Sequence, residues 1–481
     1  GASVPLLSAC GNAAAMSSAA QSSSATSSAV LSTSAAATAV TTSTTATRYV
    51  VAATTRAAGT TSAKAPAIGA TTVQPQALVG AVEVWGEAVF PFDKDVGGQI
   101  VQELESTHPS LKIAFSPVDD FTGQKLQVTT AGGTPPDLDD VNGILPQGMA
   151  LKGIAAAFDP YLATSNAINK ADLWPSLLAD ATWEGKLYGM QYAPDIRIMY
   201  LNADRYQQAG LDIHKPPATW NDLEVAISKT LQRSGQQITV AGFSPFSGSG
   251  VQNLWLVPFW QLGGELLSAD GSKVTIANDA GLTAWTWLLK IINQQGGWPA
   301  LQAFQKGHDP NQLFATDLMG NYYATNAERA ESFPKFKANP QFGYTTYPLP
   351  PNGRRVTFGG VHTFVMPTTA KQRDGAWLFL EALLSKQNNL KFALRYDRVP
   401  VRQSVAFSDQ YIQGDPFRKL VGEEMPGRKW LIAAPGGGDM RNDIVGVVAD
   451  ILQNNLGVQA ALQNAQAAMQ LKLDKALHPG T

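Results

Sequence analysis

The stretch AVEVWGEAVFPFDKDVGGQIVQELESTHPSLKIAF, residues 81–115, predicts a strand, a helix and a second strand in succession. AVEVW alternates apolar and polar side chains as a strand does, and LKIAF at 111–115 alternates again. Between them, Ile100, Val101 and Leu104 fall on one face of a helix. This unit is typical of an α/β fold, and we expect mainly parallel strand pairing.

Toward the C-terminus, helices dominate the pattern. TWNDLEVAISKTL at 219–231 predicts a helix that begins after a Thr219 cap, and RDGAWLFLEALLSK at 373–386 predicts an amphipathic one. DIVGVVADILQNNL at 443–456 and AALQNAQAAMQLKLDKA at 460–476 predict two more. Because 481 residues exceed what one ordinary core supports, we expect an α/β body in two lobes.

Toward the N-terminus, the composition changes abruptly. Residues 12–78 are mostly Ala, Ser and Thr, and their only charges are Arg48, Arg56 and Lys64. Such a segment buries too little apolar surface to offset its ordering entropy, so we expect a disordered tether. As a flexible coil it has a root-mean-square reach of about 45 Å.

The chain has one cysteine, Cys10, which follows Leu7-Ser8-Ala9. GASVPLLSA at 1–9 is typical of the end of a signal segment, with small residues before a cleavage point. Together with the tether, this predicts a lipid attached to Cys10. The alternative is a chance cysteine in a disordered tail. A net charge of −2 provides no basic field for nucleic acid.

Four longer stretches occur in order. They are LQVTTAGGTPPDLDDVNG (126–143) with GIAAAFDPYL (153–162); WEGKLYGMQYAPDIRIMYLNADRYQQAGLDIHKPPATWNDL (183–223); FWQLGGELLSADGSKVTIANDAGLTAWTWL (259–288); and YPLPPNGRRVTFGGVHTFVMPTTAKQRDGAWLFLEALLSKQNNLKFALRYDRVPVRQS (347–404). This ordered set resembles the extracellular solute-binding proteins of bacterial ABC importers. The most similar group is the carbohydrate-binding one that includes maltodextrin-binding protein.

The resemblance implies a periplasmic-binding-protein-like α/β fold, with two lobes joined by crossover strands and a ligand cleft between them. The N-terminal lobe would comprise residues 80–193 and 356–405, and the C-terminal lobe 194–355 and 406–481. Residues 1–9 would be a signal-peptide remnant, and 10–79 the lipidated tether. Hinge motion would close the two lobes on a ligand.

A sugar presents hydroxyl groups on its rim and C–H groups on its faces, so its site needs aromatic rings and polar partners. In the first lobe the resemblance implies contacts from Trp85 and Glu87, although a core Trp and a solvated acid are the alternative. It also implies contacts from Asp140 or Asn142, for which a helix cap is the alternative.

Further contacts are implied along the rest of the chain. Asp195 and Arg197 lie in the first crossover, where a structural ion pair is the alternative. Gly360 and His362 lie on the returning strand, where a structural histidine is the alternative, and Arg441 precedes a C-terminal helix. The candidate aromatic platforms of the second lobe, each with core packing as its alternative, are Trp255, Trp260, Tyr322 and Tyr323.

We therefore expect a lipid-anchored, extracytoplasmic, monomeric subunit that binds a sugar and delivers it to permease subunits served by a separate ATPase. We expect no cofactor, no metal and no catalysis, because neither a Gly-x-Ser-x-Gly elbow nor His-Glu-x-x-His occurs. The rival hypotheses are a surface-anchored glycosidase, a binding protein for glycerol phosphate and an adhesive scaffold.

Overall fold

The computed structural model describes residues 80–244 and 253–478. Cys10, the expected signal remnant and the expected tether lie outside the described residues. The predicted strand–helix–strand unit is confirmed as β1 (Gly80–Gly86), α1 (Asp95–Thr107) and β2 (Leu111–Pro117). β1 and β2 pair in parallel along their whole length, and α1 buries Ile100 and Leu104.

The first sheet has five strands in the order β2–β1–β3–β13–β6. Helix α1 packs against α14 (Arg373–Leu384) and α15 (Lys386–Arg395), two helices from much later in the chain. The remaining elements of this part are β3 (Leu138–Asn142), β6 (Met190–Pro194), β13 (Val361–Val365), α2 (Gln124–Ala131), α3 (Pro146–Leu151), α4 (Asp159–Thr164), α5 (Pro175–Ala181) and the hairpin of β4 (Thr182–Trp183) and β5 (Lys186–Leu187).

The second sheet also has five strands, in the order β11–β7–β10–β9–β8. Its strands are β7 (Arg197–Asn202), β8 (Gln232–Ser234), β9 (Gln237–Phe243), β10 (Met319–Thr325) and β11 (Phe342–Thr345). Its helices are α6 (Ala203–Gln208), α7 (Trp220–Thr230), α8 (Asn253–Gln261), α9 (Asp279–Gln294), α10 (Gly297–Gln305), α11 (Pro310–Ala315), α12 (Glu328–Glu331) and α13 (Phe333–Phe336).

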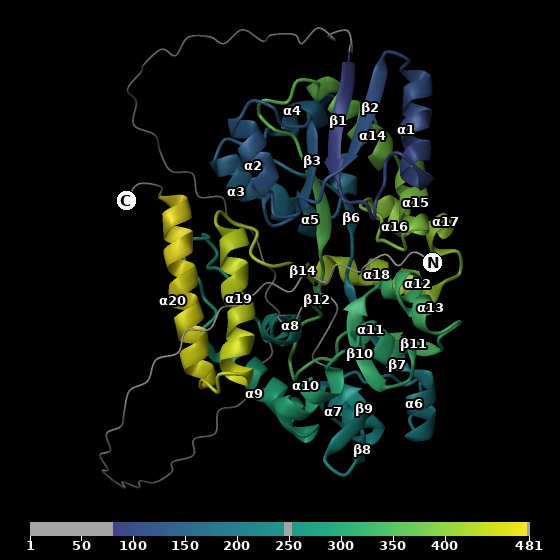
Figure 1. The fold of residues 1–481 in the computed structure, drawn as a ribbon, viewed down its shortest axis with the longest axis vertical. Coiled ribbons are helices and arrows are strands. Elements are labelled where there is room, and N and C mark those ends of the chain that lie inside the picture. The colour runs from purple at the N-terminus through teal and green to yellow at the C-terminus, as the bar shows by residue number, and fades with distance from the viewer. Residues whose placement is uncertain (1–79, 245–252, 479–481) are drawn as a thin grey trace, which may run out of the picture. The chain divides into compact units, whose positions relative to one another are not determined.

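The chain passes between the two sheets through short extended crossings. Between β6 and β7 the crossing consists of Asp195 and Ile196 alone. The return runs through β12 (Thr357–Phe358), which pairs in parallel with β14 (Arg428–Lys429), and then through Gly359 and Gly360 into β13. Both crossings therefore lie where the first sheet ends and the second begins (Figure 1).

The expectation of mainly parallel pairing is wrong. β13 is antiparallel to both β3 and β6, and in the second sheet β7 is antiparallel to β10 and β11. The physical reason is the direction of the crossings. β13 comes from the second sheet, so it enters the first sheet at the edge where β1 and β3 end. It therefore runs in the opposite direction to them.

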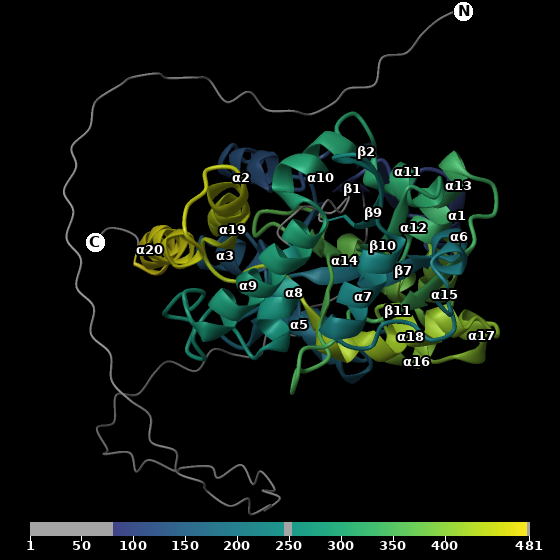
Figure 2. The ribbon, with the colours of Figure 1, turned by 90° about the horizontal axis from the view of Figure 1, so that it is seen from below.

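The predicted helices are confirmed at the C-terminal end as well. After α16 (Gln403–Ala406), α17 (Asp409–Ile412) and α18 (Pro416–Glu424), the chain forms α19 (Gly437–Leu452) and α20 (Val458–Leu477). Helices α19 and α20 lie side by side in both ribbon views, and α20 also contacts α9 (Figures 1 and 2).

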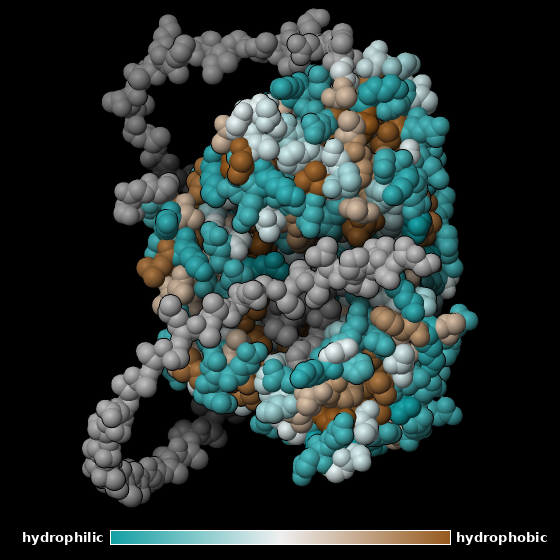
Figure 3. All heavy atoms as spheres, in the orientation of Figure 1, coloured by the Kyte–Doolittle hydropathy of each residue, from teal (hydrophilic) through white to brown (hydrophobic). Residues whose placement is uncertain are grey.

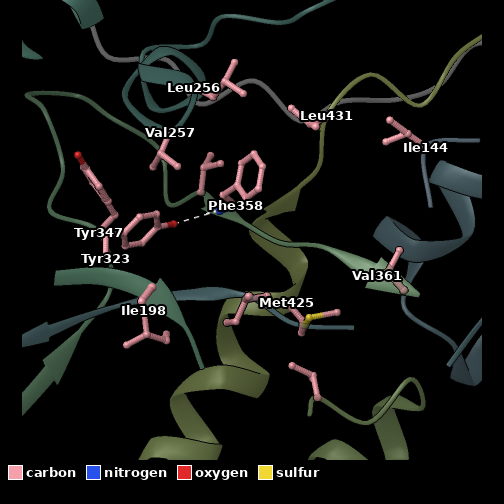
Figure 4. Packing of buried hydrophobic residues seen from close by; sticks show 14 of the residues in the cluster. Ile144, Ile198, Leu256, Val257, Tyr323, Tyr347, Phe358, Val361, Met425 and Leu431 are labelled. Carbon is pink, nitrogen blue, oxygen red and sulfur yellow. Dashed lines mark hydrogen bonds between the residues drawn. The ribbon is translucent and has the colours of Figure 1, made fainter. Parts of the chain in front are cut away.

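Most buried apolar side chains gather in one large core, with a smaller cluster around Leu126 and Met149, while hydrophilic residues predominate on the face seen in Figure 3. The core runs through the return crossing, where Phe358 lies among side chains of α8 and of the segment after β14 (Figure 4). The predicted lobe boundaries stay a prediction. The segment 406–481, assigned to the second lobe, also approaches α3, because Gly148 lies beside Pro435 and Gly436.

Candidate functional site

The facing edges of the two sheets bring four strand ends together. Glu87 follows β1, Asn142 ends β3, and Asp195 follows β6. His362, the second residue of β13, pairs with Asn142 in register, because β13 starts at the edge where β3 finishes. We call the region between these edges the seam. In open α/β sheets, ligands bind at the carboxyl ends of the strands.

Asp140 and His362 form a buried pair on the first-sheet side of the seam. Nδ1 of His362 lies 3.0 Å from Oδ2 of Asp140, and the Tyr192 hydroxyl donates to the same oxygen at 2.7 Å. Burial lowers the pKa of His362, but the charge and hydrogen bond of Asp140, with the charge of Glu87, offset burial and leave the pKa raised. The surroundings therefore favour the protonated imidazole.

Asp195 ties the two crossings to each other. Its amide donates to the Gly360 carbonyl at 3.1 Å, and its Oδ1 accepts from the Gly360 amide at 3.1 Å. The carboxylate also accepts from Arg197 and, at 3.5 Å, from Nη1 of Arg398. Burial raises the pKa of Asp195, but the two guanidinium groups outweigh it, so the pKa is lowered and the group is held ionised.

The glycines of the return crossing permit this close approach. A Cβ atom on Gly359 would lie 2.5 Å from the Asp195 carbonyl oxygen, which real Cβ atoms essentially never do. A Cβ atom on Gly360 would lie 3.0 Å from the ring of Trp430. Glycine is thus required at both positions, because a side chain would collide with the Asp195 backbone or with the Trp430 ring.

Arg398 contacts both sides of the seam. Its Nη2 donates to both carboxylate oxygens of Glu331, on α12 of the second sheet's side, at 3.1 and 3.3 Å. Its guanidinium lies 5.2 Å from the ring centre of Phe90, which belongs to the first sheet's side. Only 12% of its side chain is exposed. The side chain therefore bridges the two halves next to Asp195.

Glu87 is a half-buried acid of the seam. Its carboxylate forms no hydrogen bond and no ion pair with any residue in 80–244 or 253–478. Burial raises its pKa. Asp140 and Asp119 raise it further, and His362 and Arg398 act in the opposite direction. Both oxygens of this carboxylate are thus without a donor among the described residues.

Trp430 supplies an aromatic ring that the sequence did not single out. It follows β14 and is half-buried, and its indole N–H donates to Asn142 Oδ1 at 3.1 Å. Its ring centre lies 5.0 Å from that of Phe358. The short RKW run at 428–430 offers no periodicity, so only the pairing of β14 with β12 reveals where this ring lies.

The structure gathers part of the predicted site and disperses the rest. Gathered at the seam are Glu87, Asp140, Asn142, Asp195, Arg197, Gly360 and His362. Trp85 instead turns its indole N–H to Glu83, at 2.8 Å. Arg441 lies exposed in α19.

The expected aromatic platforms of the second lobe do not fit their role, because their rings are covered. Trp255 packs against Phe259 and Trp285 inside the core. The hydroxyl of Tyr322 donates to Asn311 at 3.0 Å, and that of Tyr323 meets Thr357 at 3.0 Å. At most 1% of the surface of each of the four residues is exposed: Trp255, Trp260, Tyr322 and Tyr323.

Within the described ranges, no three His, Cys, Asp or Glu side chains are placed to hold a metal ion. None of the helices described there has the length and apolar character needed to cross a membrane.

Comparison with known proteins places this arrangement in a family. Residues 99–417 match the family model for bacterial extracellular solute-binding proteins. A candidate binding protein of Brucella abortus (strain 2308) is 24% identical over 384 residues, which is 78% of this chain and 89% of the relative.

Two solved structures share the fold. An ABC transporter solute-binding protein from Thermotoga lettingae, bound with α-D-tagatose, superposes with a TM-score of 0.67 at 20% identity, over 82% of this chain and 99% of the other. UgpB from Mycobacterium tuberculosis, in complex with glycerophosphocholine, gives a TM-score of 0.69 at 19% identity, over 83% and 100%. The expected periplasmic-binding-protein-like fold is thereby confirmed. The family match covers most of the described residues, and the chain belongs to the bacterial extracellular solute-binding proteins.

Proposed function

We propose that this protein is the substrate-binding component of an ABC importer and that it captures a sugar or oligosaccharide at the seam. The observation that carries the proposal is the position of Asp195. This acid lies in a crossing of two residues and contacts the return crossing and Arg398, which itself reaches both halves. A guest bound beside it would contact both halves at once, and such contacts favour a closed state.

The side chains of the seam suit a polyhydroxylated guest. Glu87 accepts hydrogen bonds, while Arg398 and His362 donate them, so hydroxyl groups in either role find partners. Trp430 offers the ring against which a sugar face stacks. The tagatose in the Thermotoga lettingae relative supports this solute class.

A phosphorylated solute is the second candidate. Arg197 and Arg398 converge on Asp195, and one structural neighbour holds glycerophosphocholine. Each of these cations already pairs with a carboxylate, however, and Arg398 pairs with Glu331 as well. Two cations neutralised in this way attract a phosphate weakly, so we favour the uncharged saccharide over the phosphate.

We also propose that the chain binds its solute without hydrolysing it. A retaining or inverting glycosidase needs two carboxyl groups on opposite sides of one glycosidic bond. At the seam, Asp140 is committed to His362 and Tyr192, and Asp195 to its arginines, so neither of these two acids is free to act together with Glu87. The sugar would pass unchanged to a permease pair powered by a separate ATPase.

The anchor belongs to the same proposal. A lipid on Cys10 and the tether that follows would hold a monomeric body outside the cytoplasm and near the permease. Detergent partitioning of cell-expressed protein tests this. Wild type should enter the detergent phase, and Cys10→Ser should stay in the aqueous phase. Equal partitioning of the two would remove the anchor from the proposal.

A thermal-shift screen tests the solute class. The panel comprises mono- and oligosaccharides, glycerol 3-phosphate and glycerophosphocholine, with product analysis of each incubation. We expect a saccharide to raise the melting temperature and to be recovered intact. A shift with the phosphate compounds alone would favour the second candidate, and cleaved saccharide would favour a glycosidase.

A further inference from the structure

We propose that the solute carries a protonated amine, so that the preferred ligand is an amino sugar rather than a neutral saccharide. This inference rests on the proposed function and narrows its solute class. It follows from the charges at the seam and from three carboxylate oxygens there, both of Glu87 and Oδ1 of Asp140, that accept no hydrogen bond from any described residue.

Acidic groups outnumber basic ones at the seam. The cations that interact there are His362, Arg197 and Arg398, with two lysines at the edge, the exposed Lys335 beside Glu331 and Lys125 beside Asp119. The carboxylates that interact with them and with one another are Glu87, Asp119, Asp140, Asp195, Glu328 and Glu331. This excess of negative charge disfavours an anionic guest and favours a cationic one.

The excess of negative charge is not spread evenly over the seam, because several of the carboxylates already accept hydrogen bonds from a cation or a hydroxyl group. Asp195 holds two arginines, and Glu331 accepts both of its hydrogen bonds from Arg398. Glu328 accepts from the Thr325 hydroxyl at 3.3 Å. These groups have little need of a further cation.

Glu87 and Asp140 are different. The carboxylate of Glu87 lacks a partner among the described residues and is already half-buried. The Asp140 side chain is fully buried, and its Oδ1 accepts no hydrogen bond from any described residue. Both acids interact electrostatically with His362, so they lie around the same imidazole. The other cation that acts on Glu87, Arg398, is already paired with Asp195 and Glu331, so the charge of His362 is shared between these two carboxylates.

Ligand capture makes this shortage of positive charge more costly. Closure removes water from Glu87, and a buried unpaired carboxylate is expensive unless a charged donor replaces the water. A hydroxyl group offers one neutral hydrogen bond, whereas an ammonium group offers three donors and a full charge. Glu87 is thus the residue that would distinguish an amino sugar from its neutral counterpart.

The test compares a glucosamine trisaccharide with its N-acetylated counterpart by titration calorimetry at about pH 6, where an ordinary amine is protonated. For wild type we expect the amine form to bind at least about tenfold more tightly. Glu87→Gln should abolish this preference. The matched control is Glu103→Gln on the exposed face of α1, which removes the same charge away from the seam and should retain the preference.

The possible outcomes distinguish failure of the amino-sugar inference from failure of the saccharide-binding proposal on which it rests. If the N-acetylated form binds equally well or better, the amine inference is overturned and the saccharide proposal stands. The same holds if Glu87→Gln keeps the preference. If spermidine binds but no saccharide does, both are overturned.

Discussion

Asp139 and Asp140 are neighbours on β3 with different surroundings, because consecutive strand residues point to opposite faces. Asp140 meets His362 at the seam, whereas Asp139 is fully buried against Asp120. The two oxygens of Asp120 already accept the amides of Lys125 and Leu126, at 3.0 and 2.7 Å. Burial, followed by the charges of Asp120 and Asp140, raises the pKa of Asp139 to about 9.

This predicts a pH-dependent loss of stability. A carboxyl whose pKa is raised in the folded state stabilises the fold fully below its unfolded pKa, and that contribution is lost as the pH rises toward the folded value. The window therefore runs from about pH 4 to about pH 9. In Asp139→Asn, a neutral isostere replaces the protonated acid, so its melting temperature relative to wild type should rise across this window.

Thermal melts at a series of pH values measure the effect, with the exposed Asp119→Asn as the control. A constant difference between Asp139→Asn and wild type from pH 5 to pH 9 would contradict the assignment.

Trp430 and Trp85 provide a second comparison at the residue scale. We expect Trp430→Ala to weaken saccharide binding at least about tenfold, because stacking on a sugar face is lost. Trp85→Ala should leave the affinity unchanged, since that indole is bonded to Glu83 away from the seam. Titration calorimetry on both variants measures the two affinities. If Trp85→Ala loses saccharide affinity and Trp430→Ala does not, Trp85 is the stacking platform instead.

The sequence located the polar residues of the seam better than its aromatic ones. Glu87 follows the alternating AVEVW strand, whereas Asp195 and His362 were implied by the family resemblance. Tyr322 and Tyr323 point to opposite faces of β10, yet helices and strands cover both faces, which sequence alone does not show. Trp430 lies near Asn142 only because of contacts between residues 288 positions apart.

At the scale of elements, α7 shows how local sequence sets a boundary. Thr219 Oγ1 accepts the Asp222 amide at 3.1 Å, and the Asp222 carboxylate accepts the Thr219 amide at 2.9 Å, which forms a capping box. The predicted cap is confirmed because all of its partners lie within four residues. The direction of β13 was not predictable in this way, since it depends on a crossing from the other sheet.

The cap predicts a modest and local effect of substitution. Thr219→Ala should lower the free energy of unfolding by about 1 kcal/mol, because the amide of Asp222 loses its acceptor. Saccharide affinity should not change, since α7 is remote from Glu87 and Asp195 in the contacts described. Denaturant unfolding with and without ligand measures both quantities. A changed affinity with unchanged stability would be inconsistent with a purely local cap.

At the scale of the whole molecule, two sheets are linked by short crossings that Asp195 and Arg398 hold together. Short extended links of this kind allow one half to rotate against the other about a few backbone dihedrals. The family resemblance in the sequence predicted this architecture, and the fold comparison confirms it. The residues that contact a solute stay a prediction.

The most direct test of the account measures the distance between spin labels on the two halves. Labels would be placed at Gln99→Cys on α1 and Lys229→Cys on α7, both exposed, in a Cys10→Ser background that leaves no other thiol. If the protein captures its solute by closing at the seam, a saturating saccharide should move the distribution to a shorter distance, and Asp195→Ala should reduce the shift. An unchanged distribution with bound saccharide would contradict capture between two moving halves.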